Sequence, residues 1–317
     1  MKYRKLGSTE ISVSEIGFGT WGIGGATEGA TSYGKTDDAE SLRALAMALE
    51  KGITFYDTAG IYGHAEELLE KAFRGKRDKI VIATKVGLVT HNGPYDISPS
   101  YIRARLEESL KNLKTDYVDV FQLHSVPLEL ARATPACFET LKDLKKEGKI
   151  RSFGYSTANP ADALLAIREF GAETVQVNFN MTDQRALSEG IFDAAREHGA
   201  GVITRTPFCY GFLTGAVTET KFLDSDHRSK RSPEQLARWK EASEIFSAAD
   251  PEKCYTSAQL ALKFCIAFPE VSAVIPGMLT AKEVLENAAS SDLSPLTNKQ
   301  LEIIGKVNRE NKFFIGG

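Results

Sequence analysis

The fold is decided by residues 80–124, IVIATKVGLVTHNGPYDISPSYIRARLEESLKNLKTDYVDVFQLH. This stretch begins with an apolar run, Ile80–Lys85, and ends with another, Tyr117–His124, both rich in β-branched or aromatic residues. Between the two runs, apolar residues recur at the three- and four-residue spacing of a helix, namely Ile102, Leu106, Leu110 and Leu113. Ser98-Pro99 has the pattern of a helix start. A strand, a helix and a strand in this order predict two parallel strands joined by a crossover helix.

The same alternation continues along the chain in both directions. Eight runs are expected as strands, at Ser14–Gly19, Ile53–Asp57, Ile80–Lys85, Tyr117–His124, Arg151–Ser156, Thr174–Asn178, Gly201–Arg205 and Ser272–Ile275. Helical patterns lie between them, with start signals at Asn159-Pro160 and at Thr256, whose spacing to Gln259 is that of a capping box. Eight strand–helix units favour closure into an eight-stranded α/β barrel over an open sheet.

Residues 1–317 are predicted to form a single domain, because no internal repeat, low-complexity tract or linker interrupts the pattern. Ahead of the barrel, Tyr3–Val13 has the pattern of two short strands around a Gly-Ser turn. The least regular stretch is Phe208–Ser232, which is long for a connection without structure of its own. We expect it to be either a mobile lid or a solvated loop.

The composition is typical of a globular protein with a large core. There are 39 basic and 42 acidic residues, a formal charge of −3, and 42% hydrophobic residues. No nucleic-acid partner is implied. The segment Met1–Gly7 is basic but leads into polar residues, so we expect no signal peptide, no membrane span and a cytoplasmic location. Oligomeric state is left open.

The cysteines have no metal-like spacing, so free thiols and no metal site are expected at Cys137, Cys209, Cys254 and Cys265. We expect Cys265 to be buried in the core. For Cys209, an exposed and oxidisable thiol stays open as a minor alternative.

Four polar residues close or follow three successive predicted strands. Asp57 and Tyr62 lie in the stretch FYDTAGIYG (residues 55–63), while Lys85 and His124 end the next two runs. A phenol has a pKa near 10, so a Tyr acting as general acid or base needs a neighbouring cation, which a Lys held by a carboxylate supplies. A His beside the phenol orients and polarises a carbonyl oxygen. Since barrel chemistry lies at the carboxyl ends of the strands, the four residues predict a proton-donating site for carbonyl chemistry. The alternative is a structural ion pair beside two loop residues.

These motifs resemble the aldo-keto reductase family, whose Asp-Tyr-Lys-His tetrad has the same order and local contexts. The resemblance runs from IGFGTW (residues 16–21) to VIPG (residues 274–277) and Glu286-Asn287. It implies a (β/α)8 barrel with the N-terminal hairpin closing its bottom. It also implies an oxidoreductase that transfers hydride between a nicotinamide cofactor and a carbonyl or alcohol substrate, such as an aldehyde, ketone or sugar. Tyr62 is then the general acid/base, and the expected substrate contacts are Trp21, Tyr62 and His124.

The resemblance also implies where the cofactor lies. Ser156 and Gln176 match positions that bind the carboxamide, and Arg205 stands where many members stack an aromatic ring, a role that a guanidinium plane can also fill. Thr157 replaces a usual Asn. The segment Pro207–Gly215 resembles the loop whose amides hold the pyrophosphate, with Gly211 allowing close approach. The cofactor contacts expected here are Gly19, Thr20, Trp21, Asp57, Ser156, Thr157, Gln176, Arg205, Thr206, Pro207, Phe208, Gly211 and Leu213.

At the adenosine end the sequence departs from the family pattern. NADP-specific members bind the 2′-phosphate with basic and hydroxyl side chains after the Pro, but here Lys282 is the only cation of residues 277–283 and Glu283 stands where an Arg is usual. The Glu283 carboxylate repels a phosphate unless it caps its own helix, for which its spacing to Thr280 is suitable. The helix terminus still offers amides to an anion. The resemblance favours NADP(H), with NAD(H) as the alternative, and the expected contacts are Gly277, Thr280, Lys282, Glu286 and Asn287.

Two other functions remain as alternatives. A regulatory or sensor subunit that binds dinucleotide and turns over slowly, as potassium-channel β subunits of this superfamily do, would carry the same tetrad. A non-redox barrel enzyme is the second alternative. The sequence does not identify the small-molecule substrate or the physiological direction of the reaction.

Overall fold

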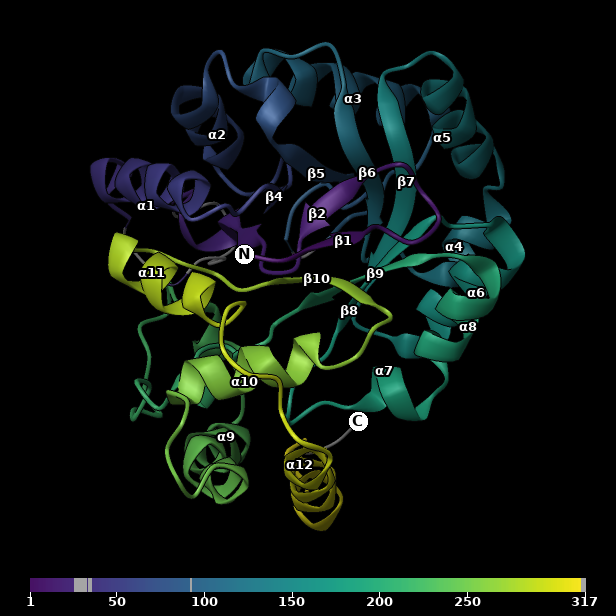
Figure 1. Ribbon diagram of the computed structural model, residues 1–317. Helices are drawn as coiled ribbons and strands as arrows, with labels where there is room; N and C mark the ends of the chain where they lie inside the picture. The colour runs from purple at the N-terminus through teal and green to yellow at the C-terminus, as the bar shows by residue number, and fades with distance from the viewer. Residues whose placement is uncertain (26–32, 34–35, 92, 315–317) are drawn as a thin grey trace.

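A computed structural model describes residues 1–25, 33, 36–91 and 93–314 of the chain. Eight parallel strands follow one another around a single sheet, each beside its sequence neighbour (Figure 1). They are β3 (Phe18–Gly19), β4 (Phe55–Asp57), β5 (Val81–Val86), β6 (Val118–His124), β7 (Ile150–Thr157), β8 (Thr174–Asn178), β9 (Gly201–Arg205) and β10 (Val271–Ile275). Parallel bridges from Ile16 to Val274 and from Gly19 to Gly277 join the two edges. The predicted barrel is confirmed.

Alternation along the strands decides which residues point into the barrel. Val81 and Ala83 of β5 and Val120 of β6 belong to one buried cluster with interior residues of other strands. Two residues further on, the same faces carry Lys85 and Gln122, which pair in register. The barrel interior is therefore apolar in the middle of these strands and polar at their carboxyl ends.

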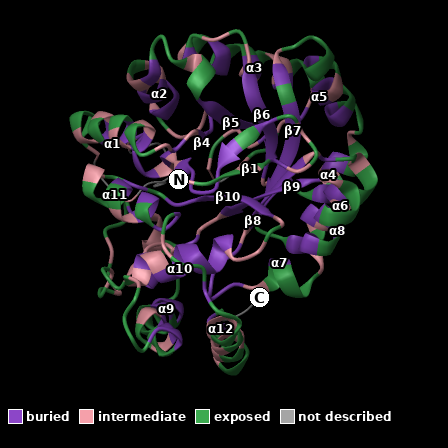
Figure 2. Cartoon of the chain, viewed as in Figure 1, coloured by how far each residue is buried: buried purple, intermediate pink, exposed green. Residues whose placement is uncertain are grey.

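Helices surround the strands and turn their buried faces toward them (Figure 2). The described helices are α1 (Asp38–Glu50), α2 (Ala65–Phe73), α3 (Pro99–Leu113), α4 (Leu128–Ala133), α5 (Ala136–Lys146), α6 (Pro160–Phe170), α7 (Arg185–Ser188), α8 (Ile191–His198), α9 (Pro233–Phe246), α10 (Ser257–Ile266), α11 (Ala281–Ala289) and α12 (Asn298–Glu310). The predicted starts of α3, α6 and α10 are confirmed, since Ser98, Asn159 and Thr256 cap them through their side chains. None of the described helices has the length and apolarity needed to cross a membrane.

The N-terminal hairpin closes the barrel at the amino ends of the strands. Strands β1 (Tyr3–Lys5) and β2 (Ser12–Ser14) pair antiparallel. Val13 of β2 and the adjacent residues Leu6 and Ile11 join the interior cluster. The Ser8 amide donates to the Gly199 carbonyl, just before β9 begins, at 2.7 Å. The predicted hairpin is confirmed, but the predicted first barrel strand began too early, because Ser14 pairs with Tyr3 in the hairpin.

The segment after β9 is folded. It contains the short 3-10 helices η3 (Phe212–Thr214) and η4 (His227–Lys230). Cys209 is 1% exposed, and burial raises the pKa of its thiol to about 12. The alternative of an exposed, oxidisable Cys209 is therefore wrong, whereas the predicted burial of Cys265 is confirmed.

Candidate active site

An ion pair lies buried at the carboxyl ends of β4 and β5. Lys85 Nζ donates to Asp57 Oδ1 at 2.5 Å, to the Thr58 carbonyl at 2.9 Å and to the Tyr62 hydroxyl at 3.4 Å. These three acceptors use all three ammonium protons. The side chains of Lys85 and Asp57 are 0% and 4% exposed. A charged pair this deeply buried persists only because each member is fully bonded, so the position of the ammonium beside the phenol is fixed.

Tyr62 reaches this pair from the turn between β4 and α2. Its amide donates to the Ala59 carbonyl at 2.9 Å, and Lys85 Nζ lies 4.9 Å from the centre of its ring. The segment after β3 packs directly on this turn, because a Cβ at Gly24 would lie 1.7 Å from the Tyr62 carbonyl oxygen. A glycine is therefore required at position 24 for the two loops to meet.

His124 at the end of β6 stands edge-on to the phenol. The two ring centres are 5.8 Å apart, with an interplanar angle of 80°. Burial, followed by the charges of Lys85 and Arg205, holds the pKa of His124 well below its usual value. The imidazole is therefore neutral at physiological pH and can donate one hydrogen bond without being a source of acid.

A chain of hydrogen bonds links this cluster to β7, β8 and β9. Gln176 Nε2 donates to Asp57 Oδ2 at 2.6 Å, and Ser156 Oγ donates to Gln176 Oε1 at 3.1 Å. Arg205 Nη1 then donates to Ser156 Oγ at 3.3 Å. Four residues expected at the nicotinamide end thus lie together, although Asp57 and Gln176 are 119 positions apart in the sequence.

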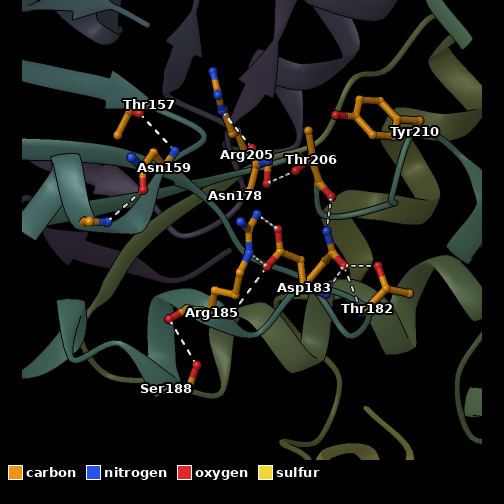
Figure 3. Close-up of polar contacts among 12 residues, drawn as sticks. Thr157, Asn159, Asn178, Thr182, Asp183, Arg185, Ser188, Arg205, Thr206 and Tyr210 are labelled. Carbon is orange, nitrogen blue, oxygen red and sulfur yellow. Dashed lines mark hydrogen bonds and ion pairs between the residues drawn. The ribbon is translucent and has the colours of Figure 1, made fainter. Parts of the chain in front are cut away.

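Sequence reasoning missed two neighbours of this cluster. Asn178 Oδ1 accepts from Arg205 Nε at 2.9 Å and fixes the guanidinium (Figure 3). It could have been found, since it ends a predicted strand two residues after Gln176 and so shares its face. His91 lies in the loop between β5 and α3, where no periodicity applies. Its ring stacks on that of Tyr62 at 6.1 Å and 12°, and its Nε2 lies 3.0 Å from the Ile61 carbonyl oxygen.

Aromatic rings meet from two segments that follow the carboxyl ends of β3 and β9. Trp21 contacts Tyr33 at 5.2 Å and His227 at 4.5 Å between ring centres, and Tyr210 contacts His227 at 5.0 Å. The Arg228 guanidinium lies 5.1 Å from the Tyr33 ring. Tyr33 and Arg228, with residues 216–219, 221–223, 225 and 226, line a cavity of about 570 Å³. The segments that follow β3 and β9 therefore contact each other through rings.

The loop expected to hold the pyrophosphate has an unusual backbone. Thr206, Cys209 and Tyr210 have φ of 54°, 46° and 58°, values that are uncommon outside glycine. Amides of the loop donate to carbonyls of the same loop, for example those of Gly211 and Leu213 to the Phe208 oxygen at 3.0 Å each. These amides are already satisfied within the loop. The role expected for them stays a prediction.

The outer expected contacts are also engaged with the protein. Thr157 Oγ1 accepts from the Asn159 amide at 3.0 Å (Figure 3). Glu286 Oε1 accepts from Thr256 Oγ1 at 2.6 Å, and Asn287 is 3% exposed. The predicted capping box of Thr280 and Glu283 is confirmed.

The residues expected at the nicotinamide end have features that suit a dinucleotide. Thr20 is completely buried, and its hydroxyl has no hydrogen-bond partner among the described residues. Among the residues that the structure describes, an added Cβ at Gly277 would meet only Tyr33, at 4.0 Å. The unsatisfied hydroxyl of Thr20 and the polar side chains of Ser156, Gln176 and Arg205 at the carboxyl ends of the strands fit a ligand that carries a carboxamide and a flat ring.

Comparisons with known proteins identify the family. The family model described as aldo/keto reductase family matches residues 15–309. Aldo-keto reductase YhdN of Bacillus subtilis (strain 168) is 34% identical over 254 residues, which are 76% of this chain and 72% of that protein. The uncharacterized oxidoreductase YqkF of the same organism is 29% identical over 317 residues, 96% of this chain and 95% of that one.

A solved structure extends the likeness to three dimensions. Aldo-keto reductase AKR11C1 from Bacillus halodurans, in its holo form, superposes with a TM-score of 0.79 at 28% identity, covering 97% of this chain and 96% of that one. These findings do not favour the regulatory-subunit alternative. The chain belongs to the aldo/keto reductase family and is an oxidoreductase that transfers hydride between a nicotinamide cofactor and a carbonyl or alcohol substrate.

Proposed function

We propose that Tyr62 is the general acid and base of this hydride transfer, supported by Lys85, Asp57 and His124. A bound nicotinamide dinucleotide supplies the hydride or accepts it. In the reducing direction Tyr62 gives its proton to the carbonyl oxygen, and the Lys85 ammonium, 3.4 Å from the hydroxyl, stabilises the phenolate that is left. In the oxidising direction the phenolate takes the alcohol proton back.

The observation that carries this proposal is the triple bonding of Lys85 Nζ. A structural ion pair alone has no need of a phenol as the third acceptor. Asp57 holds the ammonium in place, and neutral His124 donates a hydrogen bond that orients and polarises the substrate oxygen. Because His124 is not protonated, it cannot be the acid, which leaves that role to Tyr62.

The proposed cofactor site runs from this cluster along the mouth of the barrel. Ser156 and Gln176 hold the carboxamide, and Arg205, fixed by Asn178, stacks on the ring. The remaining proposed contacts are those expected from the sequence, namely Gly19, Thr20, Trp21, Asp57, Thr157, Thr206, Pro207, Phe208, Gly211, Leu213, Gly277, Thr280, Lys282, Glu286 and Asn287. The predicted preference for NADP(H) requires hydrogen-bond donors for the 2′-phosphate at the start of α11. The backbone amides there already donate to protein carboxylates, which counts against that preference.

The substrate is proposed to be a small carbonyl compound or alcohol that enters beside Trp21. The rings of Trp21, Tyr33 and His227 are in mutual contact near the cluster, which suits stacking against an aromatic compound or the apolar face of a sugar. Activity as a carbonyl reductase or an alcohol dehydrogenase fits this surface. The cytoplasmic location and the single-domain organisation stay predictions from the sequence.

The test is a steady-state assay of reduced dinucleotide oxidation against a panel of aliphatic aldehydes, aromatic aldehydes and ketoses, for the native protein and for Tyr62→Phe. We expect Tyr62→Phe to lower kcat by about 10²- to 10⁴-fold, because it removes only the transferable proton. Dinucleotide affinity, measured by calorimetry, should stay within about twofold. Unchanged turnover in Tyr62→Phe overturns the mechanism.

A further inference from the structure

The start of α11 is already filled by protein carboxylates. Glu283 Oε2 accepts from the amides of Leu279 at 2.6 Å and Thr280 at 3.0 Å. Glu40, far away in the sequence, accepts from the Ala281 amide through Oε1 at 3.3 Å. The amide groups at a helix N-terminus attract anions. Here the protein supplies two anions of its own.

Glu40 reaches this position from α1, which packs against α11. Its other oxygen, Oε2, accepts from Arg43 Nε at 3.0 Å and Nη2 at 2.5 Å. The bonds from Arg43 and from the Ala281 amide lower the pKa of Glu40 below its usual value. Glu40 is therefore ionised at neutral pH, and the charge of Arg43 is paired with it.

We propose that Glu40 and Glu283 make this site selective for a dinucleotide whose adenosine ribose carries a free 2′-hydroxyl, NAD(H), over the 2′-phosphorylated NADP(H). The inference rests on the proposed function, since it takes the start of α11 as the adenosine end of the cofactor site. Glu283 caps its own helix and Glu40 accepts from the Ala281 amide, so the amides of residues 279–281 are not free to bind a 2′-phosphate. A ribose hydroxyl, by contrast, can donate a hydrogen bond to a carboxylate.

Two described cations, Arg43 and Lys282, do not reverse this preference. Arg43 is bonded to Glu40, and Lys282 is exposed to solvent, where a lysine attracts a phosphate weakly because water and salt screen its charge. The contact between Glu40 and the Ala281 amide could not be predicted from the sequence. Glu40 lies in α1, and no spacing links position 40 to position 281.

The decisive measurement is calorimetric titration with NADH and with NADPH at low and high salt. The proteins are the native chain, Glu40→Gln, Glu283→Gln and a matched control, Glu302→Gln, which removes an exposed carboxylate from α12. We expect the native protein to bind NADH about tenfold more tightly than NADPH, and added salt to narrow the gap. Glu40→Gln should strengthen NADPH binding about three- to tenfold and change NADH binding less than twofold.

The outcomes separate the two proposals. If the native protein binds NADPH more tightly than NADH, or if Glu40→Gln shifts both affinities equally, the selectivity inference is wrong. If neither dinucleotide binds the native protein, the proposed cofactor site itself fails. Glu283→Gln keeps an acceptor for the Leu279 and Thr280 amides, and thermal unfolding of each variant establishes that α11 is retained.

Discussion

The two ends of the proposed cofactor site are built in opposite ways. At the strand ends, Asp57 and Lys85 are buried and bonded to several partners from different strands. At the start of α11, Glu40 is 31% exposed and is held by one arginine and one amide. In the proposed function, chemistry depends on groups that the barrel backbone fixes, whereas cofactor choice depends on side chains that can change without disturbing the barrel. Substitutions at the strand ends should therefore change turnover and stability, whereas substitutions at the start of α11 should change cofactor affinity.

The largest expected difference comes from the same substitution made at each end. Lys85→Met removes the ammonium and leaves Asp57 buried without its cation, which should destabilise the fold by about 3–5 kcal/mol. It should also lower kcat by about 10²- to 10⁴-fold. Lys282→Met removes an exposed cation and should leave turnover within about twofold. Steady-state kinetics and chemical denaturation measure both effects, and equal losses of turnover in the two variants contradict the comparison.

A smaller effect is expected at His91, which contacts the catalytic cluster from a loop. His91→Phe keeps a ring beside Tyr62 but loses the bond to the Ile61 carbonyl, so we expect kcat to fall about tenfold through misplacement of the phenol. His91→Gln keeps a donor and should recover part of the loss. A fall in KM with no change in kcat would show that His91 does not position Tyr62.

The stability of the fold should depend on pH through His124. The pKa of His124 is lowered in the folded state and is close to 6.5 in the unfolded state. Below pH 6.5 the unfolded chain therefore binds a proton at this residue, whereas the folded chain does not. Stability should therefore fall as the pH falls, by about 1.4 kcal/mol per pH unit until the folded pKa is reached. Urea denaturation at pH 7.5 and 5.5 measures this. His124→Gln should reduce the drop, whereas the exposed His198→Gln should not.

The smallest effect is expected for a buried glutamine beside the cluster. Both polar atoms of Gln122 lack a partner among the described residues, and its side chain is fully buried. Replacing it with Leu should change stability by less than about 1 kcal/mol. Gln176→Leu, which breaks two bonds, should cost about 1–3 kcal/mol. A large loss in Gln122→Leu would mean that ordered water bonds this amide.

The sequence predicted the parts of the molecule that follow from local periodicity. Apolar runs located the strands, and the position of Lys85 and His124 at their ends brought the cluster together, because parallel strands share one carboxyl edge. Helix caps such as Thr280 could be predicted because each involves residues close together in the sequence. The contacts of His91 and Glu40 could not be predicted. Their contacts depend on how a loop and a helix are placed around the barrel, which no spacing within the chain encodes.

The positions of the two tryptophans allow the mouth of the barrel to be studied by intrinsic fluorescence. Trp21 lies against Tyr33 and His227 beside the catalytic cluster, while Trp239 is 1% exposed and packs on Tyr210 and Phe212. The two indoles therefore have different surroundings. With Trp239→Phe, tryptophan fluorescence reports on the contact between Trp21 and His227, and with Trp21→Phe it reports on the packing of Trp239 against Tyr210 and Phe212, so the response of each contact to a ligand can be followed in real time.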